Sequence, residues 1–252
     1  GHVNAVLFSP EDLRLVKDGP EGRRRFLDME ISQLQPAYFY ALQRYARALK
    51  QRNGLLRQLL CGAAGEGFSS LQEWDALLSE AGAQIIGRRV KYLERLAEAA
   101  RETHGALSGG RETLSLAYVA GAREEGELSA LLKASRQEDL RRGTTTVGPH
   151  RDDYRLLING RDARSFASQG QQRTAALSLK LAEIEVMRRE IGEWPVLLLD
   201  DVMSELDVER RRMLLTRIES VQTLITCTHP SDLGGAKYQA AYRVQSGRLE
   251  RE

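Results

Sequence analysis

The hydrophobic residues of this chain change their spacing near residue 144, and that change constrains the fold more than any other feature. From about residue 20 to residue 142, apolar residues recur at the three- and four-residue intervals of amphipathic helices. From Thr144 onward, short apolar runs alternate with longer helical patterns. Strands that alternate with helices are typical of a sheet with helices packed on it. The pattern therefore predicts an α/β fold that also contains a long, mostly helical region.

Apolar runs and turn residues place the expected elements. The opening residues predict a strand over 3–8 and a helix that starts at Ser9-Pro10. The helical region predicts helices within 25–60 separated near Pro36, a loop over 62–67, a helix over 71–107, a strand over 114–119 and a helix over 127–142. The last region predicts strands over 154–158, 195–199, 223–227 and 242–246, helices over 169–191 and 208–218, and a hairpin turn at Asn159-Gly160.

Composition limits the class of protein. Of the 252 residues, 42% are hydrophobic and 29% are charged, which are the values of an ordinary globular protein. No apolar run is long enough for a membrane span and no signal pattern opens the chain, so we expect a cytoplasmic location and no membrane partner. Cys61 and Cys227 have neither metal-ligand spacing nor the number needed for a disulfide framework.

The net charge of +2 is no argument for nucleic-acid binding, but the arginines are clustered. Such clusters can neutralise phosphates, but a solvated helix face with acidic neighbours is the favoured explanation for any single cluster. The clusters lie at residues 23–25, 88–89, 141–142 and 210–212.

An apolar strand that ends in two acids is the sharpest chemical signal. Residues 196–199 are Val-Leu-Leu-Leu, and Asp200 and Asp201 follow them directly. Nucleotide-binding sheets use the rigid end of a buried strand to place a carboxylate near Mg²⁺. Asp200 suits that role, and Asp201 suits the orientation or deprotonation of an attacking water. A core strand that runs into an aspartate-rich turn is the alternative explanation.

A second signal heads the helix expected over 169–191. Ser168 and Gln171 have the spacing of a capping box, and Gly170 lets another molecule approach the backbone closely. The free amides at a helix N-terminus, together with a serine hydroxyl, form a ready anion site. A well-capped helix that binds nothing remains the alternative explanation.

Two further features are weaker when taken alone. His229 follows the strand expected over 223–227, where an imidazole can reach a γ-phosphate and detect its loss, or can be an incidental loop residue. Residues 148–153, Gly-Pro-His-Arg-Asp-Asp, form a compact charged turn. This turn is either a functional corner or an internally salt-bridged one.

The order of these motifs resembles that of an ABC-type ATPase head. Residues 167–171 resemble the ABC signature, and Asp200 matches the Walker B aspartate. Asp201 stands where most ABC proteins have glutamate. Residues 204–207, Ser-Glu-Leu-Asp, resemble the D-loop, and His229 resembles the switch histidine.

Longer stretches narrow the resemblance to the RecF family of DNA-repair ATPases. The stretches that resemble this family span almost the whole chain and lie at residues 8–13, 19–28, 148–153 and 168–174, together with the double aspartate Asp200-Asp201. The resemblance implies an SMC-like ATPase head, a mixed sheet with packed helices, formed by residues 1–20 and 144–252. It implies a mostly α-helical second domain inserted at residues 21–143.

The resemblance also implies roles for the candidate residues. Two copies would sandwich two ATP molecules, each between the phosphate loop of one copy and the signature helix of the other. Asp200 would hold Mg²⁺ through water, Asp201 would position the attacking water and His229 would report the γ-phosphate. The residues implied to contact the γ-phosphate across the interface are Ser168, Gln169, Gly170 and Gln171. Ser204 and Asp207 are implied to be further ATP-binding residues.

For the biological role, the resemblance implies binding to gapped DNA or to junctions between single and double strands. A RecR partner is implied in loading recombinase there, and the family's ATPase activity is weak and stimulated by DNA. The candidate DNA or partner contacts are Arg88, Arg89, Lys91 and Arg95. Lys91 and Arg95 place like charges four residues apart on one helix face, which favours an external anion.

One departure from the family pattern is large. These 252 residues contain no G-x-x-x-x-G-K-[ST] phosphate loop, because no glycine is followed by lysine. RecF proteins carry that loop upstream of the point where this chain begins. We therefore expect the chain to hold half of an ATP site and to be inactive alone. Asp201 in place of glutamate implies slow hydrolysis, since the shorter side chain lies farther from the water.

Three other classes of protein share part of this pattern. An ATP-binding subunit of a membrane transporter, or of another ABC-type machine, shares the signature and the strand-end acid, but the long helical insert argues against a transporter. A non-enzymatic partner-binding module fits the missing phosphate loop. Another SMC-like head would need a long heptad run, which the sequence lacks.

Overall fold

The beginning of the chain and its last third meet in one parallel sheet. In the computed structural model, which describes residues 3–61, 67–234 and 237–251, the central strand β5 (Val196–Asp200) lies between β1 (Ala5–Phe8) and β6 (Thr223–Thr226). Both pairings are parallel. The carboxyl ends of β5 and β6 are therefore at the same edge of the sheet, where Asp200 is opposite Thr226. Parallel sheets are usually buried on both faces, which explains why residues 196–199 are all apolar.

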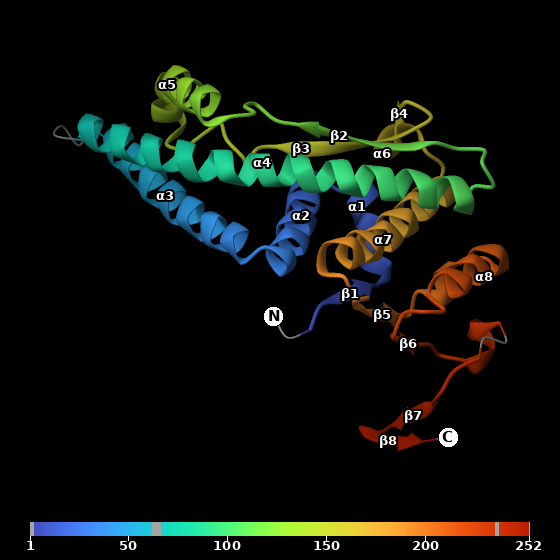
Figure 1. Cartoon of the computed structure of the whole chain (residues 1–252). Coiled ribbons are helices and arrows are strands. Elements are labelled where there is room, and N and C mark those ends of the chain that lie inside the picture. Colours follow the sequence, from blue (N-terminus) through green and yellow to red (C-terminus); the bar gives the residue numbers. More distant parts are fainter. Residues whose placement is uncertain (1–2, 62–66, 235–236, 252) are drawn as a thin grey trace.

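One long helix, α7 (Gln169–Ile191), joins the two cores of the molecule (Figure 1). One core contains the parallel sheet together with Leu177, Leu181 and Met187 of α7. The other contains Ala175, Leu179 and Val186 of the same helix, packed with the helical arm. Because residues 174–184 of α7 are all buried, this helix is the buried axis of the fold rather than a surface helix.

A helical arm extends from α7 (Figure 1). Its long hairpin pairs α3 (Pro36–Leu60) with α4 (Gly67–Leu107), and α5 (Glu125–Arg142) packs on both. An antiparallel sheet covers α4, with β3 (Asp153–Ile158) between β2 (Leu114–Val119) and β4 (Arg161–Asp162).

Shorter elements complete the chain. They are the 3-10 helices η1 (Pro10–Leu13), η2 (Met203–Glu205) and η3 (Pro230–Leu233), the helices α1 (Arg14–Lys17), α2 (Pro20–Leu34), α6 (Ala163–Phe166) and α8 (Val208–Arg217), and the strands β7 (Tyr242–Gln245) and β8 (Arg248–Arg251). The β7–β8 hairpin is exposed along its whole length and lies at the C-terminal end of the molecule (Figure 1).

Most elements expected from the pattern are confirmed. The strand over 114–119 and the helix over 169–191 match β2 and α7, and Pro36 begins α3 directly after α2 ends at Leu34. Asn159 and Gly160, both at positive φ, form the expected turn between β3 and β4. Of the loop expected over 62–67, residues 62–66 lie outside the described residues and Gly67 begins α4. The pattern did not predict β8, which pairs with β7.

The division into residues 1–20, 21–143 and 144–252 remains a prediction. The pairing of β1 with β5 agrees with joining the first segment to the last. The second boundary is crossed by a sheet, because β2 pairs with β3 along six residues on each strand, from Leu114 opposite Ile158 to Val119 opposite Asp153. The backbone hydrogen bonds of this sheet therefore join the arm to the last segment of the chain.

Two carboxylates are buried where α2 meets α7. Glu30 of α2 and Glu183 of α7 are nearly inaccessible, and Lys180 of α7 forms an ion pair with Glu183. Burial, with Glu183 as a second cause, raises the pKa of Glu30 to about 10. Burial also raises the pKa of Glu183. Glu30 is therefore protonated in the folded protein at neutral pH.

We expect this burial to make stability fall as the pH rises. The folded-state pKa of Glu30 is above its ordinary value of 4.5, so its contribution is fully present below that value and is lost as pH approaches 10. Glu30→Gln should remove this pH-dependent loss of folding stability. The loss amounts to at most about 1.4 kcal/mol for each pH unit. Urea unfolding at pH 6 and pH 8 measures it, with the exposed Glu21→Gln on the same helix as the control. Equal pH dependence in Glu30→Gln and the wild type would contradict a protonated Glu30.

Candidate functional site

The two strand-end acids lie at the carboxyl edge of the parallel sheet. Asp200 is the last residue of β5, Asp201 follows it, and both are exposed. Thr226 of β6 holds the pair: its hydroxyl donates to Asp200 Oδ1 at 2.7 Å and accepts from the Asp201 backbone N–H at 3.1 Å. The neighbouring strand thus orients both carboxylates without burying them.

Asp201 has an uncommon backbone conformation. Its φ is +51°, in the left-handed region, which asparagine and aspartate tolerate better than other non-glycine residues. The Ser204 hydroxyl stabilises this turn by donating to the Asp201 carbonyl oxygen at 2.9 Å. The sharp turn ends β5 at the sheet edge and leads directly to residues 204–207.

Ser168 caps the N-terminus of α7 as its spacing predicts. Its hydroxyl accepts from the Gln171 backbone N–H at 3.3 Å, and Gln171 Oε1 accepts from the Ser168 N–H at 2.8 Å. Gln171 also donates through Nε2 to Glu112 at 2.9 Å. Ser168 and Gln169 are exposed, so the positive end of the helix dipole faces solvent.

Two arginines connect the start of α7 to the turn after the acids. Arg173 of α7 forms an ion pair with Glu205 at 2.9 Å. Arg210 of α8 donates to the Thr174 hydroxyl at 2.9 Å and forms an ion pair with Asp207, the N-cap of α8. The backbone hydrogen bond from Arg210 is the largest cause that lowers the pKa of Asp207. The structure therefore joins the candidate signature and the candidate D-loop in one network.

His229 lies beyond the end of β6, on the same side of the sheet as the acids. It is exposed, and its backbone N–H donates to Asp232 Oδ2 at 3.3 Å. Cys227, two residues earlier, has a raised pKa because of burial, with Asp232 and Asp201 as lesser causes.

The donor set fits a metal only together with a bound phosphate. Among the residues that the structure describes, no three Cys, His, Asp or Glu side chains are grouped as a metal site. Mg²⁺ is commonly held by one or two carboxylates plus substrate phosphates. Asp200, exposed and oriented through one oxygen by Thr226, suits such a shared site.

Sequence reasoning gave Thr226 no role, and it noted Arg173 and Arg210 only within the stretches 168–174 and 210–212, without their partners. Thr226 could have been found, because parallel pairing of the two strands places it beside Asp200. The two arginines could not, since their partners are decided by how α7 and α8 pack.

The four proposed DNA contacts do not form one surface. Arg89 is wrong as a DNA contact: it is 2% exposed, pairs with Asp28 at 2.8 Å and donates to the Pro149 carbonyl at 2.7 Å. Arg88 is half-buried, with its Nη1 atom inaccessible. Arg95 forms an ion pair with Glu190, and Lys91 is exposed. The like-charge spacing of Lys91 and Arg95 therefore did not indicate an anion site, because a carboxylate of α7 already neutralises Arg95.

Residues 148–153 use most of their polar groups inside the protein. The Tyr45 hydroxyl is 2.7 Å from His150 Nδ1, and His150 Nε2 is 3.1 Å from the Thr145 carbonyl oxygen. Burial lowers the pKa of His150 to about 4, so the imidazole is neutral at physiological pH. Gly148 has φ of +119°, and a Cβ there would be 2.5 Å from the Tyr45 hydroxyl. These contacts favour the internally bonded turn over a functional corner.

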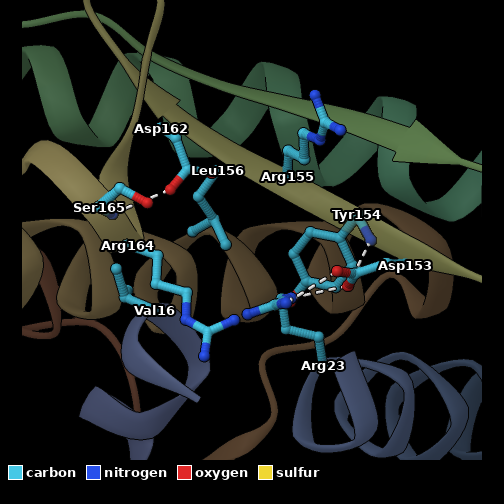
Figure 2. A pocket seen from close by; sticks show the side chains of 9 residues that line it. All are labelled: Val16, Arg23, Asp153, Tyr154, Arg155, Leu156, Asp162, Arg164 and Ser165. Atoms are coloured by element: carbon cyan, nitrogen blue, oxygen red, sulfur yellow. Dashed lines mark hydrogen bonds and ion pairs between the residues drawn. The ribbon is translucent and has the colours of Figure 1, made fainter. Parts of the chain in front are cut away.

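The last residue of this turn, Asp153, lines a hollow of about 350 Å³ beside β3 (Figure 2). Arg23 makes two hydrogen bonds to the Asp153 carboxylate, at 2.7 and 2.8 Å. Figure 2 shows Arg164 reaching toward Arg23 across this hollow. Because Arg23 is buried and paired with Asp153, one arginine of the cluster at residues 23–25 lies in the core and not on the surface.

Among the described residues, no helix combines the length and the hydropathy that a bilayer crossing requires.

Comparison with solved structures defines the class of fold. The chain superposes on the Smc head domain of Pyrococcus furiosus with a TM-score of 0.51 at 14% identity, covering 99% of this chain and 61% of that one. At that identity the likeness concerns the fold alone. Together with the strand-end acids and the capped helix, it defines an SMC-like, ABC-type ATPase head.

Closer relatives define the family. The DNA replication and repair protein RecF of Halothermothrix orenii is 45% identical over 264 residues, covering 100% of this chain and 70% of that protein. The protein of the same description from Heliobacterium modesticaldum is 46% identical, covering 99% and 69%. A solved structure described as the recombination mediator protein RecF-ATPrS in the RecFOR pathway has a TM-score of 0.91 at 40% identity, covering 100% of this chain and 68% of that one. No protein-family model matches the chain.

The chain belongs to the RecF family of DNA replication and repair proteins. This assignment excludes the transporter subunit that the ABC motifs alone left open.

Proposed function

We propose that this chain is the signature and Walker B part of an ATP-dependent DNA clamp that acts in recombinational repair and at replication forks. The carrying observation is that the turn after the acids is bonded on both sides. Its Ser204 donates to Asp201, and its Asp207 pairs with Arg210, which also donates to Thr174 near the start of α7. A RecF relative solved with ATP, of TM-score 0.90 at 40% identity, supports nucleotide as the ligand.

ATP in this proposal is the ligand that holds two copies together. The exposed N-terminus of α7 directs its positive dipole toward solvent, and a γ-phosphate held by a second copy would place negative charge opposite it. Ser168, Gln169, Gly170 and Gln171 receive that phosphate. Ser204 and Asp207 shape the turn that faces the partner copy.

The acids and His229 act on the nucleotide held by their own copy. Asp200 would hold Mg²⁺, and the ion would neutralise phosphate charge when bound. Asp201 orients the attacking water, and His229 lies beside the terminal phosphate. Loss of that phosphate removes the contact to α7 of the other copy, and the clamp opens. Hydrolysis is slow and stimulated by DNA.

Gapped or single-strand/double-strand junction DNA is the proposed substrate of the clamp, and RecR is the proposed partner in loading recombinase. The relative solved in the RecFOR pathway supports this assignment.

We expect Asp201→Asn to separate dimerisation from turnover. The test protein joins this chain to the phosphate-loop segment of a RecF relative such as that of Halothermothrix orenii. Loss of the charge that activates water should lower ATP turnover about a hundredfold or more, while ATP-driven dimers persist. Gel filtration with ATP and a phosphate-release assay measure the two effects.

The matched control is Glu219→Gln, which removes an exposed carboxylate after α8. Its turnover should equal that of the unchanged protein. Unchanged turnover in Asp201→Asn would show that Asp201 is not the catalytic acid.

A further inference from the structure

The longest acid-free helix face of the arm is on α3. This helix contains Arg44, Arg47, Lys50, Arg52 and Arg57 but no aspartate or glutamate. Other segments neutralise two of these charges, because Arg44 pairs with Glu80 at 2.9 Å and the buried Arg52 pairs with Asp75 and Asp139. In the part of the chain that the structure describes, no carboxylate forms an ion pair with Arg47, Lys50 or Arg57.

These three cations share one face, which we call the α3 stripe and define as Arg47, Lys50, Gly54 and Arg57. The four positions are three or four residues apart, so they follow one another along the helix surface. The opposite face packs into the arm through buried residues such as Tyr45, Ala48 and Leu56. The three side chains are exposed and extend over about 15 Å of helix, at 1.5 Å per residue.

Gly54 lies between the charges and has no internal reason to be glycine. It is inside α3 with no positive φ, and a Cβ built on it would meet nothing within 4 Å. Glycine within a helix is destabilising relative to alanine, because it loses more backbone freedom on folding. Gly54 therefore leaves the helix backbone between the unpaired cations open to the close approach of another molecule.

We propose that the α3 stripe binds the phosphate backbone of duplex DNA, an inference that rests on the proposed function as a DNA clamp. Duplex DNA offers about one negative charge for every 1.7 Å of its axis, so a stripe of this length faces several phosphates. Contacts from arginine and lysine to phosphates fix position without reading sequence, which suits binding at gaps and junctions of any sequence. The straight helix suits a straight, regularly charged partner better than an irregular acidic protein surface.

The test compares two triple variants that lose the same charge. The stripe variant carries Arg47→Gln, Lys50→Gln and Arg57→Gln. The control variant carries Arg101→Gln, Lys133→Gln and Arg217→Gln, which are exposed cations on α4, α5 and α8. The DNA affinity of the full chain is measured by fluorescence anisotropy across a range of salt concentrations. The probe is a labelled duplex that contains a single-stranded gap.

We expect the stripe variant to bind roughly tenfold more weakly or worse at about 0.15 M salt. The slope of log affinity against log salt should become shallower by about 2 to 3, since each lost phosphate contact removes about 0.9. The control variant should bind like the unchanged chain.

Gly54→Gln provides a readout that a purely structural role would not produce. The new side chain has free space in the protein and a better helix propensity, so the midpoint of thermal unfolding should rise. DNA affinity should nevertheless fall, because the side chain occupies the space of the phosphate backbone.

The outcomes separate this inference from the proposed function. Wild-type affinity in the stripe variant, or an equal loss in the control variant, overturns the α3 stripe and leaves DNA binding in place. No DNA binding by the unchanged chain overturns both. Competition by poly-glutamate as effective as that by duplex DNA, at equal charge concentration, would indicate an acidic protein partner and contradict the assignment to DNA.

Discussion

Ser168→Arg should abolish ATP-driven dimerisation while leaving ATP binding by a single copy almost unchanged. The test protein again joins this chain to a RecF phosphate-loop segment. Ser168 is exposed at the start of α7, where the proposed γ-phosphate of the other copy would touch it. A long side chain at that position blocks the approach and removes the cap hydroxyl from the amides. Sedimentation with and without ATP should show dimers for the unchanged protein and monomers for the variant.

The controls separate the phosphate contact from the cap. Ser165→Arg adds the same side chain at another exposed serine three residues earlier, and dimers should persist. Ser168→Asp keeps a good N-cap, but its negative charge opposes a phosphate, so dimers should again be lost. An equal loss of ATP binding and of dimerisation in Ser168→Arg would contradict a role across the interface.

Arg52→Ala should destabilise the arm by about 3 to 5 kcal/mol, the largest stability effect that we expect of a single substitution. The Arg52 side chain is fully buried, donates to Asp75 and to Asp139 at 2.7 Å each, and donates to the Thr145 hydroxyl at 2.8 Å. Removing it leaves Asp139, which is also fully buried, without its cation. These contacts connect α3, α4, α5 and the segment that leads into residues 148–153.

Arg44→Ala provides the comparison on the same helix. Arg44 pairs with Glu80 at 2.9 Å, but both side chains are about half exposed, so its loss should cost less than about 1 kcal/mol. Urea unfolding measures both variants. A cost for Arg52→Ala as small as that for Arg44→Ala would show that Asp139 is compensated in another way.

The sequence predicted local structure well because the signals are themselves local. The capping pair Ser168 and Gln171 marked the start of α7, and the chain does end that helix at a left-handed Gly192. The turn at Asn159-Gly160 and the apolar strand before Asp200 were found in the same way. In each case, the residues that decide the conformation are neighbours in the sequence.

What the sequence could not predict depends on contacts between distant segments. The pairing of β1 with β5 and that of β2 with β3 decide the topology, and no local pattern encodes either one. Arg89 looked like part of a basic surface, yet its partners Asp28 and Pro149 are far away in sequence. Packing decides whether an arginine faces solvent or a buried carboxylate, and the number of charges in a sequence does not reveal the packing.

The candidate site shows the same division. Spacing alone gave Asp200, Asp201, Ser168 and His229, because strand ends and helix starts are local features. The bond from Arg210 to Thr174 of α7, beside its ion pair with Asp207, came only from the fold. Whether the acids and the helix start act on one nucleotide or on two depends on how two copies meet.

Mixing two inactive proteins tests that central claim most directly. One protein carries Ser168→Arg and the other carries Asp201→Asn, both joined to the phosphate-loop segment, and ATP turnover is measured for each alone and for the mixture. If α7 of one copy completes the site whose acids belong to the other, a mixed pair has one intact site and the mixture hydrolyses ATP. If the helix start and the acids serve the same nucleotide within one copy, the mixture is as inactive as its components, and the clamp proposed here is wrong.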